Sequence, residues 1–252
     1  MKRTRILMGM PITIDVVDAK VKETDIAGIF DYFAYVDRTF STYKKESEIS
    51  RLNSGEITKK QVSTDVRQIL QLADDTKKES NGYFNIVHKG QIDPSGIVKG
   101  WAIYNAASLL REHGFQHFHI DAGGDIQVSG KNDKGECWTV GIKNPFKQDE
   151  IVKVVKIDNK GIATSGLYIR GEHIYNPHNP EAPITGIASM TIIGPTVYDA
   201  DRFATAAFAM GEKGIQFIEK LPGYDGYMID SKGIATMTSR FERFVVKDDI
   251  LK

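Results

Sequence analysis

The chain has 252 residues, of which 41% are hydrophobic and 26% charged, and its 33 Lys and Arg residues balance its 33 Asp and Glu residues. This is the composition of a globular protein, and zero net charge with neutral histidines gives no reason to expect a nucleic-acid partner. Cys137 is the one cysteine, which excludes an intrachain disulfide and a cysteine-based zinc cluster, and no apolar stretch is long enough for a membrane span.

The first half of the chain predicts a strand followed by three helices. Apolar residues alternate over 6–16, which predicts one strand there. Apolar residues at helical spacing predict a helix over 26–40, and good capping residues begin a second helix at Ser63. A third helix is expected over 95–112, ended by Gly114, and we expect it to be buried because it is apolar nearly all round.

Short strands dominate the second half. Strand-like segments lie at 118–120, 126–128, 138–142, 152–157, 189–193, 227–229 and 241–246, with one helix at 200–210 that continues near 215–221. Helices and strands therefore come in mixed runs and not in strict alternation. We predict an α+β fold in which residues 1–252 form a single domain, with a mostly antiparallel sheet and packed helices.

The segment from Asp93 to Gly100 is a candidate anion site. It joins an acidic residue and a turn of small residues to the start of the third helix. Free backbone N–H groups and the positive end of the helix dipole would lie beside Ser95 and Gly96, with Lys99 one turn further on. This combination suits a phosphate or another anionic ligand, and the alternative is an ordinary helix cap with a solvated lysine.

The segment around Asp201 is a candidate site for a hard cation. Asp201 and Thr205 are four residues apart on a predicted helix, so their oxygens share one face. A carboxylate and a hydroxyl near a helix start, completed by backbone oxygens and water, suit Mg²⁺ or Ca²⁺. The alternative is that Asp199 caps the helix and that Thr205 bonds back to a carbonyl.

Histidines provide two further candidates. His173 could act as a general base because its ordinary pKa lies near neutrality, although a lone histidine is more often structural. His113, His117 and His119 lie close in sequence. No cysteine and no HExxH-type base accompanies them, so we do not favour zinc.

These clusters, in this order, resemble the ApbE family of FAD:protein FMN transferases. No single motif is decisive, but the series covers most of the chain. The matching segments are Met8 to Pro11, Phe40 to Tyr43, Ser47 to Asn53, Gly82 to Asn85, Asp93 to Gly100, Gly123 to Asp125, Thr164 to Gly166, His173 with Pro177, and Asp201 to Gly211.

The resemblance implies an enzyme that uses Mg²⁺ to transfer the FMN half of FAD to a Thr or Ser hydroxyl of a client flavoprotein, releasing AMP. It implies that Asp201, Thr205 and the backbone carbonyl of Gly96 ligate the metal. It further implies that His173 is the base for the acceptor hydroxyl, and that Tyr43 packs on the isoalloxazine. The residues implied to contact FAD or line its pocket are Met8, Tyr43, Gly82, Tyr83, Phe84, Asp93 and Lys99.

The chain departs from the family pattern at several positions. Asn85 and Asn176 stand where the family usually has Asp, and the segment between Phe84 and Asp93 is shorter than in many relatives. Two alternative functions therefore stay open: a Mg²⁺-dependent FAD pyrophosphatase that gives FMN and AMP, and an FAD-binding protein without turnover.

The N-terminus bears on where the protein acts. The basic residues at 1–5 precede an apolar stretch too short for a signal peptide. Many relatives are exported lipoproteins, and no such leader is present here. We therefore expect a cytoplasmic protein, the alternative being an extracytoplasmic lipoprotein whose leader has been removed.

Overall fold

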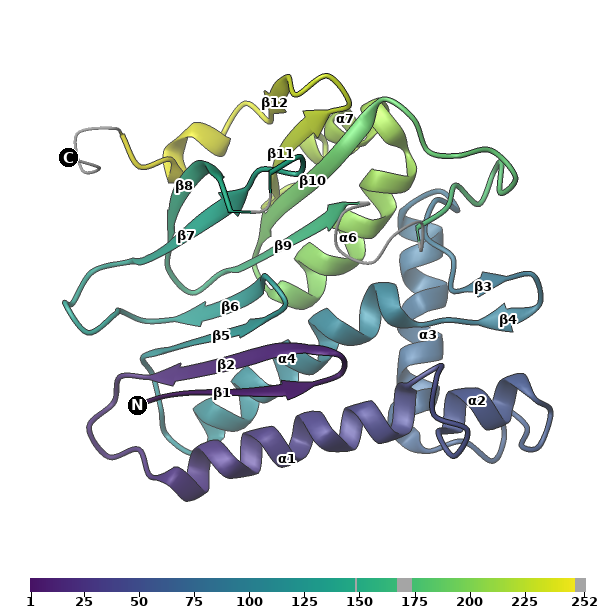
Figure 1. The fold of residues 1–252 in the computed structure, drawn as a ribbon, viewed down its shortest axis with the longest axis horizontal. Coiled ribbons are helices and arrows are strands. Elements are labelled where there is room, and N and C mark those ends of the chain that lie inside the picture. Colours follow the sequence, from purple (N-terminus) through teal and green to yellow (C-terminus); the bar gives the residue numbers. More distant parts are fainter. Residues whose placement is uncertain (148, 167–173, 248–252) are drawn as a thin grey trace.

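The structure is a computed structural model, and it describes residues 1–147, 149–166 and 174–247. Its largest sheet has eight strands in the order β1-β2-β5-β6-β9-β10-β11-β12 (Figure 1). These strands are β1 (Lys2–Leu7), β2 (Met10–Val16), β5 (Phe118–Ala122), β6 (Asp125–Ser129), β9 (Gly161–Gly166), β10 (Ile187–Gly194), β11 (Asp225–Asp230) and β12 (Ala235–Met237). Every pairing in this sheet is antiparallel, as the α+β prediction requires.

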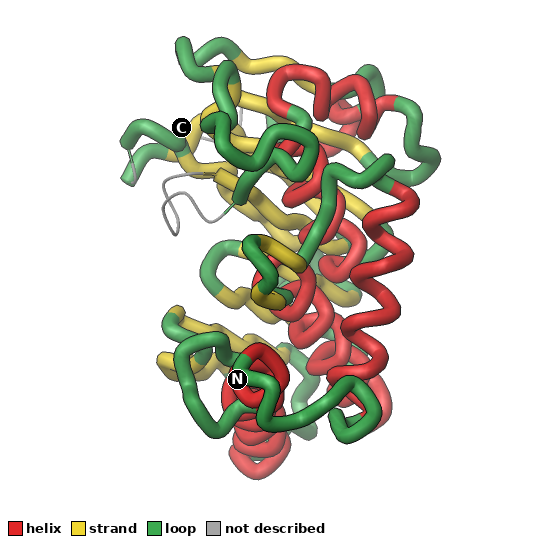
Figure 2. The backbone as a smooth tube through the Cα atoms, turned by 90° about the vertical axis from the view of Figure 1, so that its right-hand side faces the viewer, coloured by secondary structure: helices red, strands yellow, loops and turns green. Residues whose placement is uncertain are grey.

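Helices gather on one side of this sheet (Figure 2). They are α1 (Glu23–Phe40), α2 (Glu48–Asn53), α3 (Thr64–Glu79), α4 (Ser95–Glu112), α6 (Val197–Ala209) and α7 (Gly214–Glu219). The predicted helices over 26–40, 63 onward, 95–112, 200–210 and 215–221 are thereby confirmed. No helix in the described part of the chain is long and apolar enough to cross a membrane.

Two small hairpins complete the fold. They are β3 (Val87–His88) with β4 (Gln91–Ile92), and β7 (Trp138–Lys143) with β8 (Ile151–Ile157). Apolar residues of β7 and β8 pack against the large sheet in one buried cluster with Ile126 and Ile162. This hairpin therefore covers the face of the sheet that the helices leave open.

The core on the helix side explains why α4 is apolar nearly all round. Phe118, Ile120 and Ala122 alternate along β5, and all three are buried in one cluster with residues of α1 and α4. A second cluster lies between α6 and β10. Because α4 contacts α1, α6 and the sheet, it is enclosed on several sides, as the sequence predicts.

The strand predicted over 6–16 is wrong, because the chain reverses within it. Met8 and Gly9 both have positive φ, +54° and +73°, which is the backbone of a tight hairpin turn between β1 and β2. Ile6 is consequently 72% exposed, whereas Ile12 and Ile14 of β2 are fully buried. The alternation belongs to β2 alone.

Two other strand assignments also need correction. The segment 241–246 contains a 3₁₀-helix, η2 (Phe241–Phe244), because Phe241 and Phe244 are buried on one face at the three-residue spacing of that helix. Strand β9 was not predicted as a strand. A Cβ on Gly161 at its start would lie 1.9 Å from the backbone nitrogen of Val197, so this glycine lets β9 pass close to α6.

Candidate active site

The site is built where α4 crosses α6. A Cβ on Gly100 would lie 2.6 Å from the Cβ of Asp201 and 2.8 Å from the carbonyl oxygen of Val197, so only glycine permits this approach. Asp201 is 4% exposed, and its Oδ2 accepts a hydrogen bond from the Gly100 nitrogen at 2.7 Å. The crossing therefore holds a carboxylate against the first turns of α4.

The three predicted metal ligands come together at this crossing. Thr205 Oγ1 donates to the carbonyl oxygen of Gly96 at 3.4 Å. In a regular helix that carbonyl accepts from the Gly100 nitrogen, the same donor that reaches Asp201. Ser165 of β9 adds a hydroxyl 3.5 Å from Thr205 Oγ1. A carboxylate, a hydroxyl and a backbone carbonyl form an oxygen donor set that fits a hard cation such as Mg²⁺.

Two cavities flank the N-terminus of α4. The first has a volume of about 310 Å³, and Met8, Tyr43, Asp93 and Lys99 are among its lining residues. The second has a volume of about 430 Å³, and its lining includes Tyr83, Phe84, Asp93, Gly96 and Thr205. Asp93 and Ser95 line both cavities, so the start of α4 divides them.

Tyr43 stands out from the other aromatic residues by its exposure. Its side chain is 96% exposed, and the residue lines the first cavity. A core role is therefore excluded. An aromatic ring held beside a cavity offers a flat apolar surface to a ligand, which agrees with the role implied by the family resemblance.

Lys99 reaches a partner that the sequence analysis did not assign. Its Nζ lies 2.6 Å from Asp125 Oδ2, and the two side chains are 11% and 2% exposed. Asp125 Oδ1 also accepts from the backbone nitrogen of Thr164 at 3.0 Å. Lys99 nevertheless lines the first cavity, so the residue that Asp125 holds also borders the space where a ligand could bind. The sequence signal that could have drawn attention to Asp125 is its position directly after Gly123 and Gly124.

Gly82 supports the second cavity without lining it. Its φ of +85° is in the left-handed region, and a Cβ would lie 3.3 Å from the ring of His178. The His178 and Tyr83 rings meet edge-on, with centroids 4.5 Å apart. Gly82 therefore shapes the turn that presents Tyr83 and Phe84. His173, the predicted base, lies outside the described residues.

The two asparagines that depart from the family pattern serve local turns. Asn85 Oδ1 accepts from the Val87 nitrogen at 3.1 Å, and Asn176 Oδ1 accepts from the His178 nitrogen at 2.9 Å. Either interaction needs an acceptor oxygen and no charge, so Asn in place of Asp keeps these turns intact.

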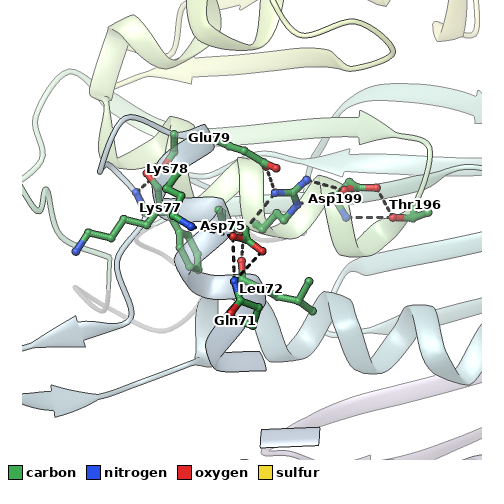
Figure 3. Close-up of polar contacts among 12 residues, drawn as sticks. Gln71, Leu72, Asp75, Lys77, Lys78, Glu79, Thr196 and Asp199 are labelled. Atoms are coloured by element: carbon green, nitrogen blue, oxygen red, sulfur yellow. Dashed lines mark hydrogen bonds and ion pairs between the residues drawn. The ribbon is translucent and has the colours of Figure 1, made fainter. Parts of the chain in front are cut away.

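Arg202 fastens the helix that carries the metal-ligand candidates. Its guanidinium donates to Glu79 at the end of α3 and to Asp199 Oδ1 at 2.9 Å. In Figure 3 the carboxylates of Glu79 and Asp199 lie on either side of the guanidinium group that they share, and Asp199 also contacts Thr196. Burial lowers the pKa of Arg202, but the bonds to Glu79 and Asp199 outweigh it and leave the pKa raised. The turn at 80–84 follows α3 directly, so the contact between Arg202 and Glu79 also connects this turn to α6.

The fold and the site define a protein with an oxygen-donor cluster at a helix crossing, next to a cavity lined by Gly96 and Thr205 and beside an antiparallel sheet. The ApbE family model matches residues 8–90 and 87–228. The chain belongs to the ApbE family.

Named relatives and solved structures agree with this membership. FAD:protein FMN transferases of Salmonella typhimurium and Haemophilus influenzae are 28% and 31% identical over 169 and 161 residues, which are 62% and 58% of this chain. Those matches cover 48% and 45% of the relatives, so the chain spans about half their length.

The structural similarity to solved structures extends over nearly the whole chain. The crystal structure of the ApbE protein from Thermotoga maritima has a TM-score of 0.86 at 19% identity, covering 98% of this chain and 99% of that one. The flavin transferase ApbE from Vibrio cholerae has a TM-score of 0.81 at 22% identity, covering 97% and 98%.

Proposed function

We propose that this protein is a Mg²⁺-dependent flavin transferase, which moves the FMN half of FAD onto a Thr or Ser hydroxyl of a client flavoprotein and releases AMP. The observation that carries the proposal is the convergence of Asp201, Thr205 and the Gly96 carbonyl at the helix crossing, where Gly96 and Thr205 also line the second cavity. Family membership and the names of the relatives support the same activity.

Asp201, Thr205 and the Gly96 carbonyl would hold Mg²⁺. The set fits because it contains a buried carboxylate and two neutral oxygens. Gly96 also leaves room for the Thr205 side chain, since a Cβ on Gly96 would lie 3.1 Å from the Thr205 Cγ2. When bound, the ion stabilises the negative charge that develops on the diphosphate.

The chain's own residues bind and orient FAD in this proposal. Tyr43 offers its exposed ring to the isoalloxazine at the first cavity. The positive end of the α4 dipole and the Lys99 ammonium attract the diphosphate. The second cavity, with Tyr83 and Phe84, then accommodates a further part of the same ligand.

The transfer itself breaks one P–O bond and forms another. The acceptor oxygen bonds to the phosphorus of the FMN half, the bond from that phosphorus to the bridging oxygen breaks, and AMP leaves with that oxygen. The acceptor hydroxyl loses its proton, and we propose His173 as the base that takes it. Positioning and charge stabilisation dominate such reactions, in keeping with a site made of oxygen ligands and a lysine.

The experiment that tests this proposal offers FAD and Mg²⁺ to the protein with and without an acceptor. A library of peptides with a central Thr is a suitable acceptor, with AMP measured by chromatography and the flavin by the mass of the peptides. The proposal expects AMP together with flavin-labelled peptide. AMP and free FMN without labelling would make the protein an FAD pyrophosphatase, and FAD binding without AMP would make it a binding protein.

A further inference from the structure

A third cavity lies on the face of the sheet opposite α4 and α6. It has a volume of about 750 Å³, and we call it the trough. Its floor includes His119 and Asp121, which alternate along β5 with the residues buried against the helices. Because successive side chains of a strand point to opposite faces, these two face away from the helix side.

One wall of the trough is the edge of a strand. Thr139, Gly141 and Lys143 of the exposed face of β7 line it together with Val140 of the opposite face, so the backbone edge of β7 forms part of this wall beside its exposed face. β7 pairs with β8 on one side, and no strand of the described residues pairs with its other side. A strand edge of this kind can bind an extended peptide through its main-chain groups.

The trough adjoins the catalytic side at a fork in the sheet. β6 and β9 pair only at Ile126 with Ile162 and at Gln127 with Gly161. Beyond these pairs, the Asp125 carboxylate fills the gap: Oδ1 accepts from the Thr164 nitrogen at 3.0 Å, and Oδ2 meets Lys99 Nζ at 2.6 Å.

The residues at the fork belong to both sides. Asp125 and Thr164 line the trough, whereas Lys99 lines the first cavity. Gly9 and Met10, at the turn between β1 and β2, line both the trough and the first cavity. A molecule that reaches Asp125 in the trough is therefore separated from Lys99 of the proposed FAD site by the Asp125 carboxylate alone.

We propose that the trough binds the acceptor: an extended segment of the client protein that carries the Ser or Thr hydroxyl, runs along the free edge of β7 and directs that hydroxyl toward the fork at Asp125. The inference rests on the proposed transferase function. An extended segment suits the trough because a strand edge forms one wall, and because the polar floor can satisfy main-chain groups. The edge of β7 that the segment would follow comprises the five residues from Thr139 to Lys143, which span about 16 Å at about 3.3 Å per residue.

The test fills the trough without touching the FAD site. Thr139 is exposed and lines the trough, so we choose Thr139→Trp, with Lys143→Trp as a second variant at the far end of β7. The matched control is Thr236→Trp, an exposed threonine on β12 that lines none of the three cavities. The probe is the library of peptides with a central Thr, with FAD affinity and the melting temperature measured on the same preparations.

The proposal expects both trough variants to lower the kcat/KM for peptide labelling by about tenfold or more while FAD affinity and melting temperature stay at wild-type values. Thr236→Trp is expected to label like the wild type. Labelling by Thr139→Trp and Lys143→Trp at the wild-type rate would overturn the proposal, and so would a parallel loss of FAD affinity, since the trough would then hold FAD. If the wild type releases no AMP and labels no peptide, the transferase function itself fails, which is a different result.

Discussion

The carboxylate of Asp201 accepts a hydrogen bond from the backbone nitrogen of Gly100 at 2.7 Å, across the crossing of α6 and α4. A Cβ on Gly100 would lie 2.6 Å from the Asp201 Cβ, so the two helices approach each other closely at these residues. Helix packing and the presentation of a metal ligand therefore depend on one contact, and mutations there will affect stability and activity together unless they are chosen to separate the two.

Gly100→Ala tests the packing side of this contact. The new Cβ would lie 2.6 Å from the Asp201 Cβ and 2.8 Å from a backbone oxygen, so the helices must move apart. We expect a loss of about 1–3 kcal/mol in the free energy of unfolding, the usual cost of overpacking. Urea denaturation measures it. Gly28→Ala on α1 is the control, because a Cβ there meets nothing within 4 Å, and it is expected to be neutral or slightly stabilising. Equal stability of Gly100→Ala and wild type would contradict the close approach.

Tyr43→Ala tests the proposed flavin contact. Because Tyr43 is 96% exposed, its loss leaves the core unchanged and the melting temperature at its wild-type value. Loss of stacking and burial is expected to weaken FAD binding by about 1–3 kcal/mol, measured by titration of flavin fluorescence. Tyr104→Ala on α4, a partly exposed tyrosine that lines none of the three cavities, is the control. The same FAD affinity in both variants would remove Tyr43 from the site.

The grouping of several candidate site residues could be predicted because these residues lie close together in sequence. Asp201 and Thr205 are four residues apart on one helix, and Asp93, Gly96 and Lys99 follow one another at the start of another helix. Helical spacing fixes which of these side chains share a face.

The long-range contacts could not be predicted from periodicity. The Lys99–Asp125 pair joins α4 to β6, and Arg202 joins α6 to Glu79 of α3. Such pairs depend on how two elements cross in space, and residue spacing within one element does not reveal the position of another element. The hairpin at Met8 and Gly9 was missed for another reason: apolar residues at 6, 8 and 10 extend the alternation of β2 in the sequence, although the turn pairs Ile6 with Pro11 and so places Ile6 on the face opposite Ile12.

His119 predicts a pH dependence of stability. Burial lowers its pKa, and the nearby carboxylates of Asp121 and Asp15 oppose this only in part. In the unfolded chain His119 takes up a proton near the ordinary histidine pKa of about 6.5, whereas in the folded protein it does so only at lower pH. The contribution of His119 to the free energy of unfolding is therefore complete above about pH 6.5 and is lost as the pH falls.

Urea midpoints at several pH values between 5 and 8 measure this effect. His119→Gln is expected to flatten the dependence by at most about 1.4 kcal/mol per pH unit. His113→Gln, at the exposed C-terminal end of α4, is expected to leave it unchanged. A wild-type pH profile in His119→Gln would show that the imidazole does not titrate with folding.

His173→Ala tests the proposed base. If His173 takes the proton from the acceptor, labelling should fall by about 10²–10⁴-fold while FAD affinity and melting temperature hold. Wild-type labelling should also rise with pH through the pKa of this group and then level off, because only the neutral imidazole accepts a proton. A parallel fall in FAD affinity and melting temperature would indicate a structural role instead.

The central claim is that Asp201, Thr205 and the Gly96 carbonyl form a Mg²⁺ site that supports cleavage of FAD. The most direct measurement is the rate of AMP release from FAD as a function of Mg²⁺ concentration, in wild type, Asp201→Asn and Thr205→Val. Asn keeps an oxygen that can accept from the Gly100 nitrogen and Val keeps the shape of Thr, so both variants should stay folded. We predict Mg²⁺-dependent release in the wild type and its loss in both folded variants. Release by Asp201→Asn at the wild-type rate and with the same Mg²⁺ dependence would contradict the account.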